Sequence, residues 1–371
     1  MKKHLLATSA IVGSLFAFAG QASAQTTITA DMHLTYSAIS NEGSAGAADR
    51  AGSYRGFGKE TQLNIKHVGK LNNGVGYVAG FSIEHDGNDK TLVQNNGTGA
   101  TATQNSVDIS GMFNENVYMD FIFGNTTLTV GADHIQNPDF TYTNLAGFRA
   151  DPEDILDGVG KSNTGADNLY AGSATSRYTS FGAGIIQDLG FAKVSYYYVP
   201  GGTPSAETGV GTTPLVAAEK DATETGHEFM ARGNLGVKGL DATLFYSTQD
   251  SEGATAKDAI GRMVGAKYNF GSITVGAELK RNTSAAAVTT ESRSGAVGYA
   301  INKDLTVAVG LMEAERKQPG ALGLTEDTKF LQVGYNLGPV AAGLAYVTAD
   351  NIGGTQGNEA KGLYFQLSSA F

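Results

Sequence analysis

Alternation of apolar and polar residues over residues 27–38 limits the possible folds of this chain more than any other feature. Ile28, Met32 and Leu34 lie on the apolar parity, and Asp31 and His33 lie on the polar one. Since successive side chains of a β-strand point to opposite faces, the segment predicts a strand with one apolar and one polar face. Ordinary strands have about 5–6 residues. This one has roughly a dozen and reaches the roughly 9–11 that a tilted strand needs to cross a bilayer.

The same alternation recurs in further segments along the chain. Short turns and long polar loops alternate as the connections between these segments. Seven short and eight long connections imply about sixteen antiparallel strands, with both chain ends on the short-turn side. The segment 174–186 is poorly patterned and leaves this count open by one strand pair. We expect the long loops near residues 39–57, 87–105, 136–173, 200–225, 249–258, 282–290, 315–326 and 349–359. The predicted fold class is all-β: a transmembrane antiparallel β-barrel with short periplasmic turns and long external loops.

Aromatic residues gather at the two ends of the expected strands. One group precedes long loops and the other lies beside short turns or the chain end: Tyr36, Tyr198, Tyr246 and Tyr346, and Phe123, Phe191, Phe270 and Phe371. Two such belts are typical of membrane interfaces. The alternative is that aromatic residues favour strand ends in any β protein.

The first residues have the layout of a secretory signal peptide: Lys2 and Lys3, a short apolar stretch, and a small-residue site at 22–24. We therefore expect a signal peptide over residues 1–24 and a single barrel domain over 25–371. No later segment is apolar over eighteen or so residues, so helical membrane spans are not expected. Loss of the two lysines would take the formal charge from −10 to −12. Such a chain repels phosphate backbones, so nucleic acid is not an expected partner.

Motifs for catalysis are incomplete. His227-Glu228 begins like a zinc-protease motif, but Ala231 stands where the second histidine is needed. Gly160-Lys161-Ser162 imitates the end of a phosphate-binding loop, but Ile155 occupies the position of the required glycine. We expect no enzyme activity, no catalytic residue, no metal site and no cofactor. Structural calcium in the external loops, at Asp151, Glu153 and Asp154, is an alternative that lacks a recognised ligand spacing.

Three stretches of the chain resemble a known family. The C-terminal stretch 361–371 (KGLYFQLSSAF) resembles an outer-membrane assembly signal, which ends on Phe with apolar residues at alternate positions before it; Ser369 departs from the aromatic residue often found there. The stretch 58–77 (GKETQLNIKHVGKLNNGVGY) resembles the second and third strands of Gram-negative general-diffusion porins of the alphaproteobacterial type, and residues 116–137 resemble the next hairpin. The assembly-signal residues are Phe371, Leu367, Phe365 and Leu363.

This resemblance implies a homotrimer of sixteen-stranded barrels in the outer membrane of a Gram-negative bacterium, with the third external loop folded into each pore. The expected partners are outer-membrane lipid, lipopolysaccharide and the outer-membrane assembly machinery. An inward third loop would bring acidic residues to the constriction, opposite charged residues of the wall. The candidate constriction residues are Asp151, Glu153, Asp154 and Asp157 of the loop, and Asp31, His33, Lys66 and Arg232 of the wall. The alternative is that the acidic loop is solvated surface.

We expect an outer-membrane porin with a water-filled channel for passive diffusion of small hydrophilic solutes and ions, with mild cation selectivity. The main alternative is a substrate-specific porin for a sugar or a small organic acid, which needs a line of aromatic residues or a basic ladder in the lumen. Only Tyr197, Phe245 and Tyr364 have the lumen parity. A secreted adhesive β protein would have shorter strands and no C-terminal Phe.

Overall fold

A computed structural model describes the greater part of the chain. The described residues are 25–42, 52–86, 92–96, 103–107, 112–132, 142–147, 181–200, 225–250, 258–284, 287–317, 325–354 and 356–371. The predicted signal peptide, residues 1–24, lies outside them.

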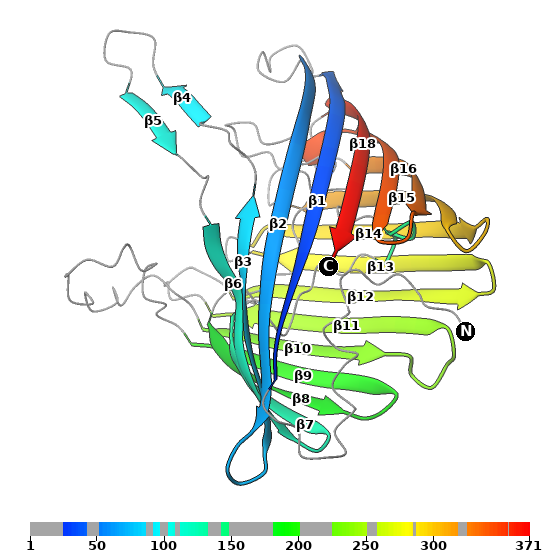
Figure 1. Ribbon diagram of the computed structural model, residues 1–371. Coiled ribbons are helices and arrows are strands. Elements are labelled where there is room, and N and C mark those ends of the chain that lie inside the picture. Colours follow the sequence, from blue (N-terminus) through cyan, green and yellow to red (C-terminus); the bar gives the residue numbers. More distant parts are fainter. Residues whose placement is uncertain are drawn as a thin grey trace.

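Sixteen antiparallel strands form one closed barrel (Figure 1), which confirms the predicted fold class and strand number. Each strand pairs with its neighbours in the barrel wall, and β18 closes the barrel against β1. The first eight strands of the barrel are β1 (Gln25–Glu42), β2 (Gly52–Lys70), β3 (Gly76–Asp86), β6 (Met112–Phe123), β7 (Thr126–Gly131), β8 (Gly182–Asp188), β9 (Ala192–Val199) and β10 (Gly226–Gly233). The others are β11 (Leu240–Gln249), β12 (Ala259–Phe270), β13 (Ile273–Thr283), β14 (Thr289–Ala300), β15 (Leu305–Lys317), β16 (Thr325–Asn336), β17 (Val340–Asp350) and β18 (Glu359–Ala370).

The last residue completes the closure. The backbone N–H of Phe371 donates to the carbonyl of Ala30, and the N–H of Ala30 donates to the carbonyl of Phe371, each over 2.8 Å. A closed barrel leaves no strand edge, so every strand has a partner for its backbone groups on both sides.

Short turns join the strands at the end of the barrel where β1 begins and β18 ends. Gly124-Asn125 and Gly271-Ser272 are two-residue turns, and their glycines have φ of 62° and 74°. Hairpin turns this tight need positive φ, which glycine adopts at the least cost.

Several connections differ in length from the prediction. The loop predicted at 39–57 is shorter, because β1 continues to Glu42 and β2 begins at Gly52. The loop predicted at 282–290 is shorter for the same reason, since Asn282 pairs with Thr290. Backbone pairing therefore continues at these strand ends after the alternation of apolar and polar residues has stopped. The segment predicted as a loop at 87–105 contains a separate two-stranded sheet of β4 (Leu92–Asn96) and β5 (Thr103–Val107).

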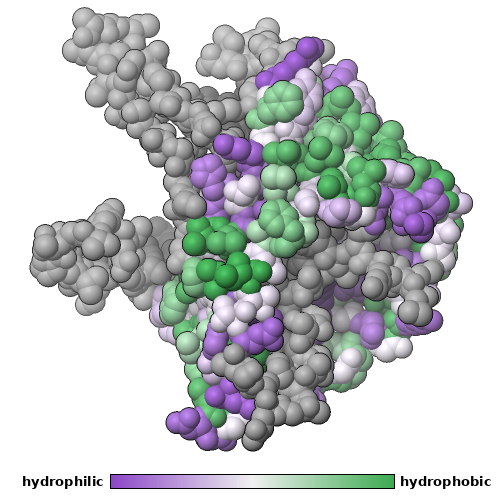
Figure 2. All heavy atoms as spheres, viewed as in Figure 1, coloured by the Kyte–Doolittle hydropathy of each residue, from purple (hydrophilic) through white to green (hydrophobic). Residues whose placement is uncertain are grey.

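The apolar parity of each strand faces outward. Ile28, Val309 and Leu344, which have the apolar parity of their strands, are 63%, 53% and 42% exposed. In Figure 2 green, hydrophobic residues gather over the outer face of β18, β16 and β15. Among the described residues no helix has the length and apolar character to cross a membrane. An apolar exterior on a closed sheet is typical of a transmembrane β-barrel.

The aromatic residues of both predicted belts also lie on this outer face. Phe123, Phe191 and Phe270 are about half exposed at the short-turn end. Tyr198 and Tyr346 are exposed near the opposite end. Their positions agree with interfacial belts, which place amphipathic rings at the lipid headgroups.

The inner face is not uniformly polar. A cluster of buried apolar residues lies on the inner side of β14–β18, and its members include Met312, Phe330 and Val347. Leu145 and Ala146, which belong to the third long connection, pack against it. Part of that connection is therefore inside the barrel, where it covers apolar wall residues that would otherwise face the lumen.

Candidate functional site

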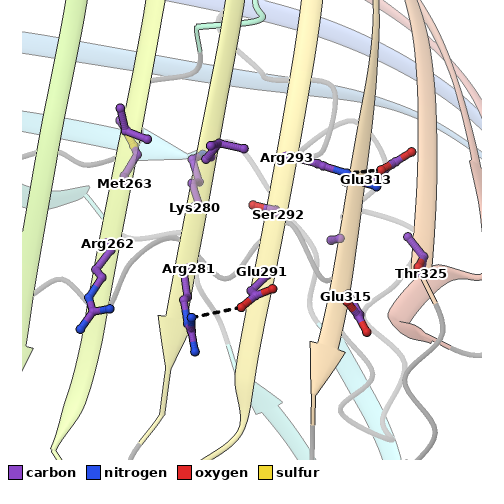
Figure 3. Close-up of a pocket in the computed structure, with 13 residues that line it drawn as sticks. Arg262, Met263, Lys280, Arg281, Glu291, Ser292, Arg293, Glu313, Glu315 and Thr325 are labelled. Atoms are coloured by element: carbon purple, nitrogen blue, oxygen red, sulfur yellow. Dashed lines mark hydrogen bonds and ion pairs between the residues drawn. The ribbon is translucent and has the colours of Figure 1, made fainter.

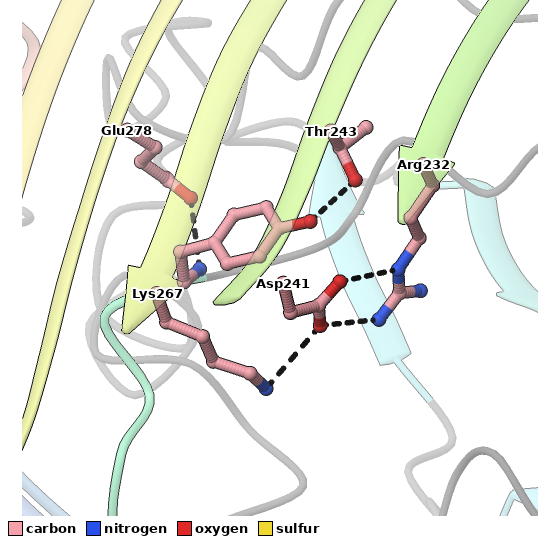
Figure 4. Close-up of polar contacts among 6 residues, drawn as sticks. Arg232, Asp241, Thr243, Lys267 and Glu278 are labelled. Atoms are coloured by element: carbon pink, nitrogen blue, oxygen red, sulfur yellow. Dashed lines mark hydrogen bonds and ion pairs between the residues drawn. The ribbon is translucent and has the colours of Figure 1, made fainter. Parts of the chain in front are cut away.

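Residues 142–147 of the third long connection are held against the inner wall by polar contacts with two strands. The backbone N–H of Tyr142 donates to Glu278 Oε2 on β13 over 3.0 Å. The Tyr142 hydroxyl also shares a hydrogen bond with Thr243 Oγ1 on β11. Figure 4 marks both contacts with dashed lines, one at Glu278 and one at Thr243. Tyr142 is only 2% exposed, and burial raises the pKa of its phenol, which is uncharged at neutral pH.

Glycines of the wall make room for this segment. A Cβ on Gly276 would lie 1.8 Å from the Tyr142 carbonyl oxygen, and a Cβ on Gly334 would lie 1.9 Å from the Ala146 carbonyl oxygen. Gly265 and Gly298 similarly face the Tyr142 ring and the Leu145 side chain. These four glycines, on β12, β13, β14 and β16, form a track in which the segment lies. The close approach of the two backbones therefore requires residues without a side chain.

A charged network lies beside this anchor. The Arg232 guanidinium donates two hydrogen bonds to Asp241, over 3.2 Å from Nε and 3.0 Å from Nη2. Lys267 Nζ lies 3.7 Å from the same carboxylate. Figure 4 shows the two cations on opposite sides of Asp241. Lys193 is opposite Arg232 in the register of β9 and β10 and opposite Asp188 in the register of β8 and β9, so this part of the wall carries charges of both signs.

A second ion pair is almost fully buried. Lys280 Nζ lies 3.1 Å from Glu278 Oε1, and the two side chains are 8% and 3% exposed. The other oxygen of Glu278 accepts the Tyr142 N–H. One carboxylate thus compensates a buried ammonium group and holds the inward segment.

The predicted wall residues of β1 and β2 form a separate group. Asp31 Oδ1 lies 3.4 Å from His33 Nε2, and Asp31 Oδ2 accepts a hydrogen bond from Asn64 Nδ2 over 3.3 Å. His33 Nδ1 lies 3.2 Å from Gln366 Nε2 of β18. Lys66 has the same inward parity, two residues beyond Asn64 along β2.

The predicted wall residues therefore do not form one cluster. Around the barrel, β1 is seven strands from β10 in one direction and nine in the other. Asp31, His33 and Lys66 thus stand on the wall opposite Arg232. Opposed groups of this kind can set a transverse field in a water-filled lumen.

The acidic loop residues predicted for the constriction, Asp151, Glu153, Asp154 and Asp157, lie outside the described residues. The predicted site residues did not include Tyr142, Thr243 and Glu278, which join the loop to the wall. They also did not include Asp241, which pairs with Arg232 and Lys267. The inward parity of Asp241 and Glu278 was available in the sequence. That Tyr142 reaches Glu278 and Thr243 follows only from the path of the loop.

More aromatic residues face inward than the sequence pattern predicts. Tyr118 and Phe330 join Tyr197, Phe245 and Tyr364 on the inner face. All except Tyr364 are at most 9% exposed. The Tyr197 hydroxyl, for example, donates to the Gly131 carbonyl over 2.5 Å. These rings pack within the wall and do not form an exposed line along the lumen.

The residues of the predicted assembly signal lie along β18 and at its end. Leu363 and Phe365 are 40% and 37% exposed on the outer face, and Leu367 has the same parity. Phe371 is 75% exposed. The apolar parity expected of the signal is therefore present on the outer face.

Comparison with known sequences identifies one family. A family model described as Gram-negative porin matches residues 7–293. No curated protein matches the chain.

Solved structures similar to this barrel are also porins. The anion-selective porin from Comamonas acidovorans is 14% identical with a TM-score of 0.60, and the alignment covers 94% of this chain and 100% of that one. A triple mutant of the Rhodopseudomonas blastica porin is 14% identical with a TM-score of 0.57, covering 93% and 100%. The trimer form of OmpT from Vibrio cholerae is 10% identical with a TM-score of 0.60, covering 94% and 100%. At these identities the likeness concerns the fold.

Proposed function

Because the chain belongs to the Gram-negative porin family, we propose that it forms a water-filled channel through which small hydrophilic solutes and ions diffuse passively. Family and barrel together make it a multi-pass protein of the outer membrane. The observation that carries the proposal is the division of the wall into an apolar outer face and an inner face with charged side chains. A sheet with these two faces is stable in a bilayer when it encloses water.

The general channel is favoured over the substrate-specific alternative. A sugar channel needs aromatic faces that a solute can touch, whereas Tyr118, Tyr197, Phe245 and Phe330 are buried in the wall. A channel for organic acids needs an exposed basic ladder. Two of the inner basic residues, Arg232 and Lys280, are already paired with carboxylates.

Mild cation selectivity is the second part of the proposal. It is supported by the formal charge of −10 and by inward carboxylates such as Glu84, Asp120, Glu228 and Glu326. Asp151, Glu153, Asp154 and Asp157 would add to them if the third loop carries them into the constriction. The Comamonas porin is described as anion-selective, but at 14% identity it shares the fold and does not determine the sign of selectivity here.

We further propose a homotrimer, since a similar barrel from Vibrio cholerae was solved in trimer form. Outer-membrane lipid, lipopolysaccharide and the assembly machinery, acting through Phe371 and the apolar parity of β18, are the other proposed partners. Catalysis, a metal site and a cofactor have no role in the proposal; calcium bridged by Asp151, Glu153 and Asp154 stays a separate alternative.

Reversal potentials in planar bilayers under a salt gradient test the selectivity. A cation-selective channel should give a reversal potential with the same sign as the equilibrium potential of the cation. The opposite sign would contradict the proposed selectivity. Swelling of proteoliposomes in a series of sugars and organic acids separates the two kinds of channel. A general channel gives rates that fall smoothly with solute size, whereas uptake that saturates with one solute indicates the substrate-specific porin.

A further inference from the structure

Four charged residues form a row across the outer face of β12–β15, near the long connections. Arg262 is directly opposite Arg281, Arg281 is opposite Glu291, and Glu291 is opposite Glu315. The row thus places two guanidinium groups side by side and two carboxylates side by side. Like charges directly opposite each other destabilise a sheet unless a counter-ion lies between them.

The acidic half of the row has such a counter-ion. Lys317 Nζ lies 2.5 Å from Glu291 Oε2 and 3.4 Å from Glu315 Oε2. One ammonium group therefore bridges the two carboxylates.

The basic half has no equivalent bridge among the described residues. Arg281 Nη1 lies 3.3 Å from Glu291 Oε1, on the side away from Arg262. The Arg262 guanidinium lies 5.8 Å over the Tyr246 ring, and no described carboxylate lies within ion-pair distance of it. Figure 3 shows Arg262 and Arg281 extending the same way from neighbouring strands. By symmetry with the acidic half, an anion would bridge them.

The two arginines border a groove that both apolar and charged residues line. Its carboxylates, Glu291, Glu313 and Glu315, are already paired with Arg281, Arg293 and Lys317. The groove has a volume of about 480 Å³, and Val264 and Leu279 line it next to the arginines. These two residues are 44% and 57% exposed on the lipid-facing side. A volume in the range of about 300–1,000 Å³ accommodates a small ligand. A free anion would contact only the arginines. A lipid would contact the arginines with its phosphate group and the apolar residues with its acyl chain.

We infer that Arg262 and Arg281 bind the phosphate group of a lipid in the outer leaflet, with an acyl chain of that lipid against Val264 and Leu279. Guanidinium groups present donors in a planar fork that matches phosphate oxygens. The rim with the long connections is the external one in outer-membrane barrels, which assigns the lipid to the outer leaflet. This inference rests on the proposed function in one respect only: the barrel must lie in the outer membrane.

Titration of the detergent-solubilised full-length protein, followed by native mass spectrometry, tests this site. The probes are the phosphorylated lipid anchor of lipopolysaccharide, the same lipid after removal of its phosphates, and inorganic phosphate. We expect the phosphorylated lipid to bind about tenfold more tightly than the dephosphorylated one, and inorganic phosphate not to compete at matched concentration. Arg262→Gln and Arg281→Gln should each weaken binding about tenfold. Arg281→Lys, which keeps the charge but loses the fork, should have a smaller effect.

Lys238→Gln is the matched control, because Lys238 is an exposed cation in a short turn at the opposite rim. It should leave lipid binding unchanged. Equal binding of both lipids, or an equal effect of Lys238→Gln, would overturn the inference. So would competition by free phosphate, which would indicate an anion site, or a change of oligomeric state with intact lipid binding, which would indicate a contact between copies.

Channel conductance separates this inference from the proposed function. Both arginines face outward, so their variants should conduct like the unaltered protein. Intact conductance without phosphate-dependent lipid binding refutes the lipid site alone. Phosphate-dependent binding by a protein that never conducts refutes the channel alone.

Discussion

The backbone N–H of Tyr142 donates a hydrogen bond to Glu278 Oε2 over 3.0 Å, and so joins two residues that are 136 positions apart in the chain. The contact fixes part of the third long connection on the inner wall. Because Glu278 also compensates Lys280, the position of the connection and the stability of the wall depend on the same carboxylate.

Substitution of Gly276 by Ala should displace the inward segment. The new Cβ would lie 1.8 Å from the Tyr142 carbonyl oxygen, and overpacking of this kind costs about 1–3 kcal/mol of unfolding free energy. We expect lower stability in urea and an altered single-channel conductance. Gly295→Ala on β14 is the control, because its Cβ would have only one neighbour, 4.0 Å away. Equal effects of both substitutions would refute the glycine track.

Replacement of Glu278 by Gln should lower the unfolding free energy by about 3–5 kcal/mol, because it leaves the nearly buried Lys280 without this partner. Lys280→Met in the same protein should restore much of the loss, since the ammonium group that lost its carboxylate is then absent. Urea unfolding of the two single variants and the double variant gives the coupling energy. If the loss of unfolding free energy in the double variant equals the sum of the losses in the two single variants, Glu278 and Lys280 do not act as a pair.

Arg232→Gln should increase cation selectivity. The guanidinium now binds Asp241 through two hydrogen bonds, and its loss leaves more net negative charge on the inner wall. The reversal potential under a salt gradient should move toward the equilibrium potential of the cation, and Asp241→Asn should move it the other way. Arg293→Gln on the outer face, where Arg293 pairs with Glu313, should leave the potential unchanged. An equal shift with Arg293→Gln would show that the inner wall does not set selectivity.

Val309→Arg should destabilise the protein in lipid by about 2–4 kcal/mol, the cost of an arginine on the lipid face near the bilayer midplane. Val309 is outward and 53% exposed in the middle of an apolar run on β15. Gln62→Arg on the inner face of β2, beside Glu84, should cost much less. Unfolding in lipid vesicles measures both, and a smaller loss for Val309→Arg would mean that the faces are assigned the wrong way round.

The barrel itself could be predicted because its exterior follows a period of two along each strand. The number of strands could be predicted because short and long connections alternate along the chain. Strand ends such as Ser40–Glu42 could not be predicted, because backbone pairing continues there after the alternation stops. The sheet of β4 and β5 was missed because residues 92–107 have no amphipathic pattern.

The inner wall was harder to predict than the exterior. Parity placed Arg232, Asp31 and His33 correctly on the inner side, but it gives no information on which residues meet across the barrel. The anchoring of Tyr142 depends on Gly276 and Gly334, which belong to different strands and come into line only in the folded sheet. A glycine in one strand carries no signal of a chain packed against it.

Single-channel recording of the purified protein in planar bilayers tests the central claim most directly, since a barrel with a charged inner wall should conduct ions through water. We predict stable conductance steps that rise in proportion to salt concentration and close in groups of three. A correctly folded barrel that inserts into the bilayer and gives no steps would contradict the account.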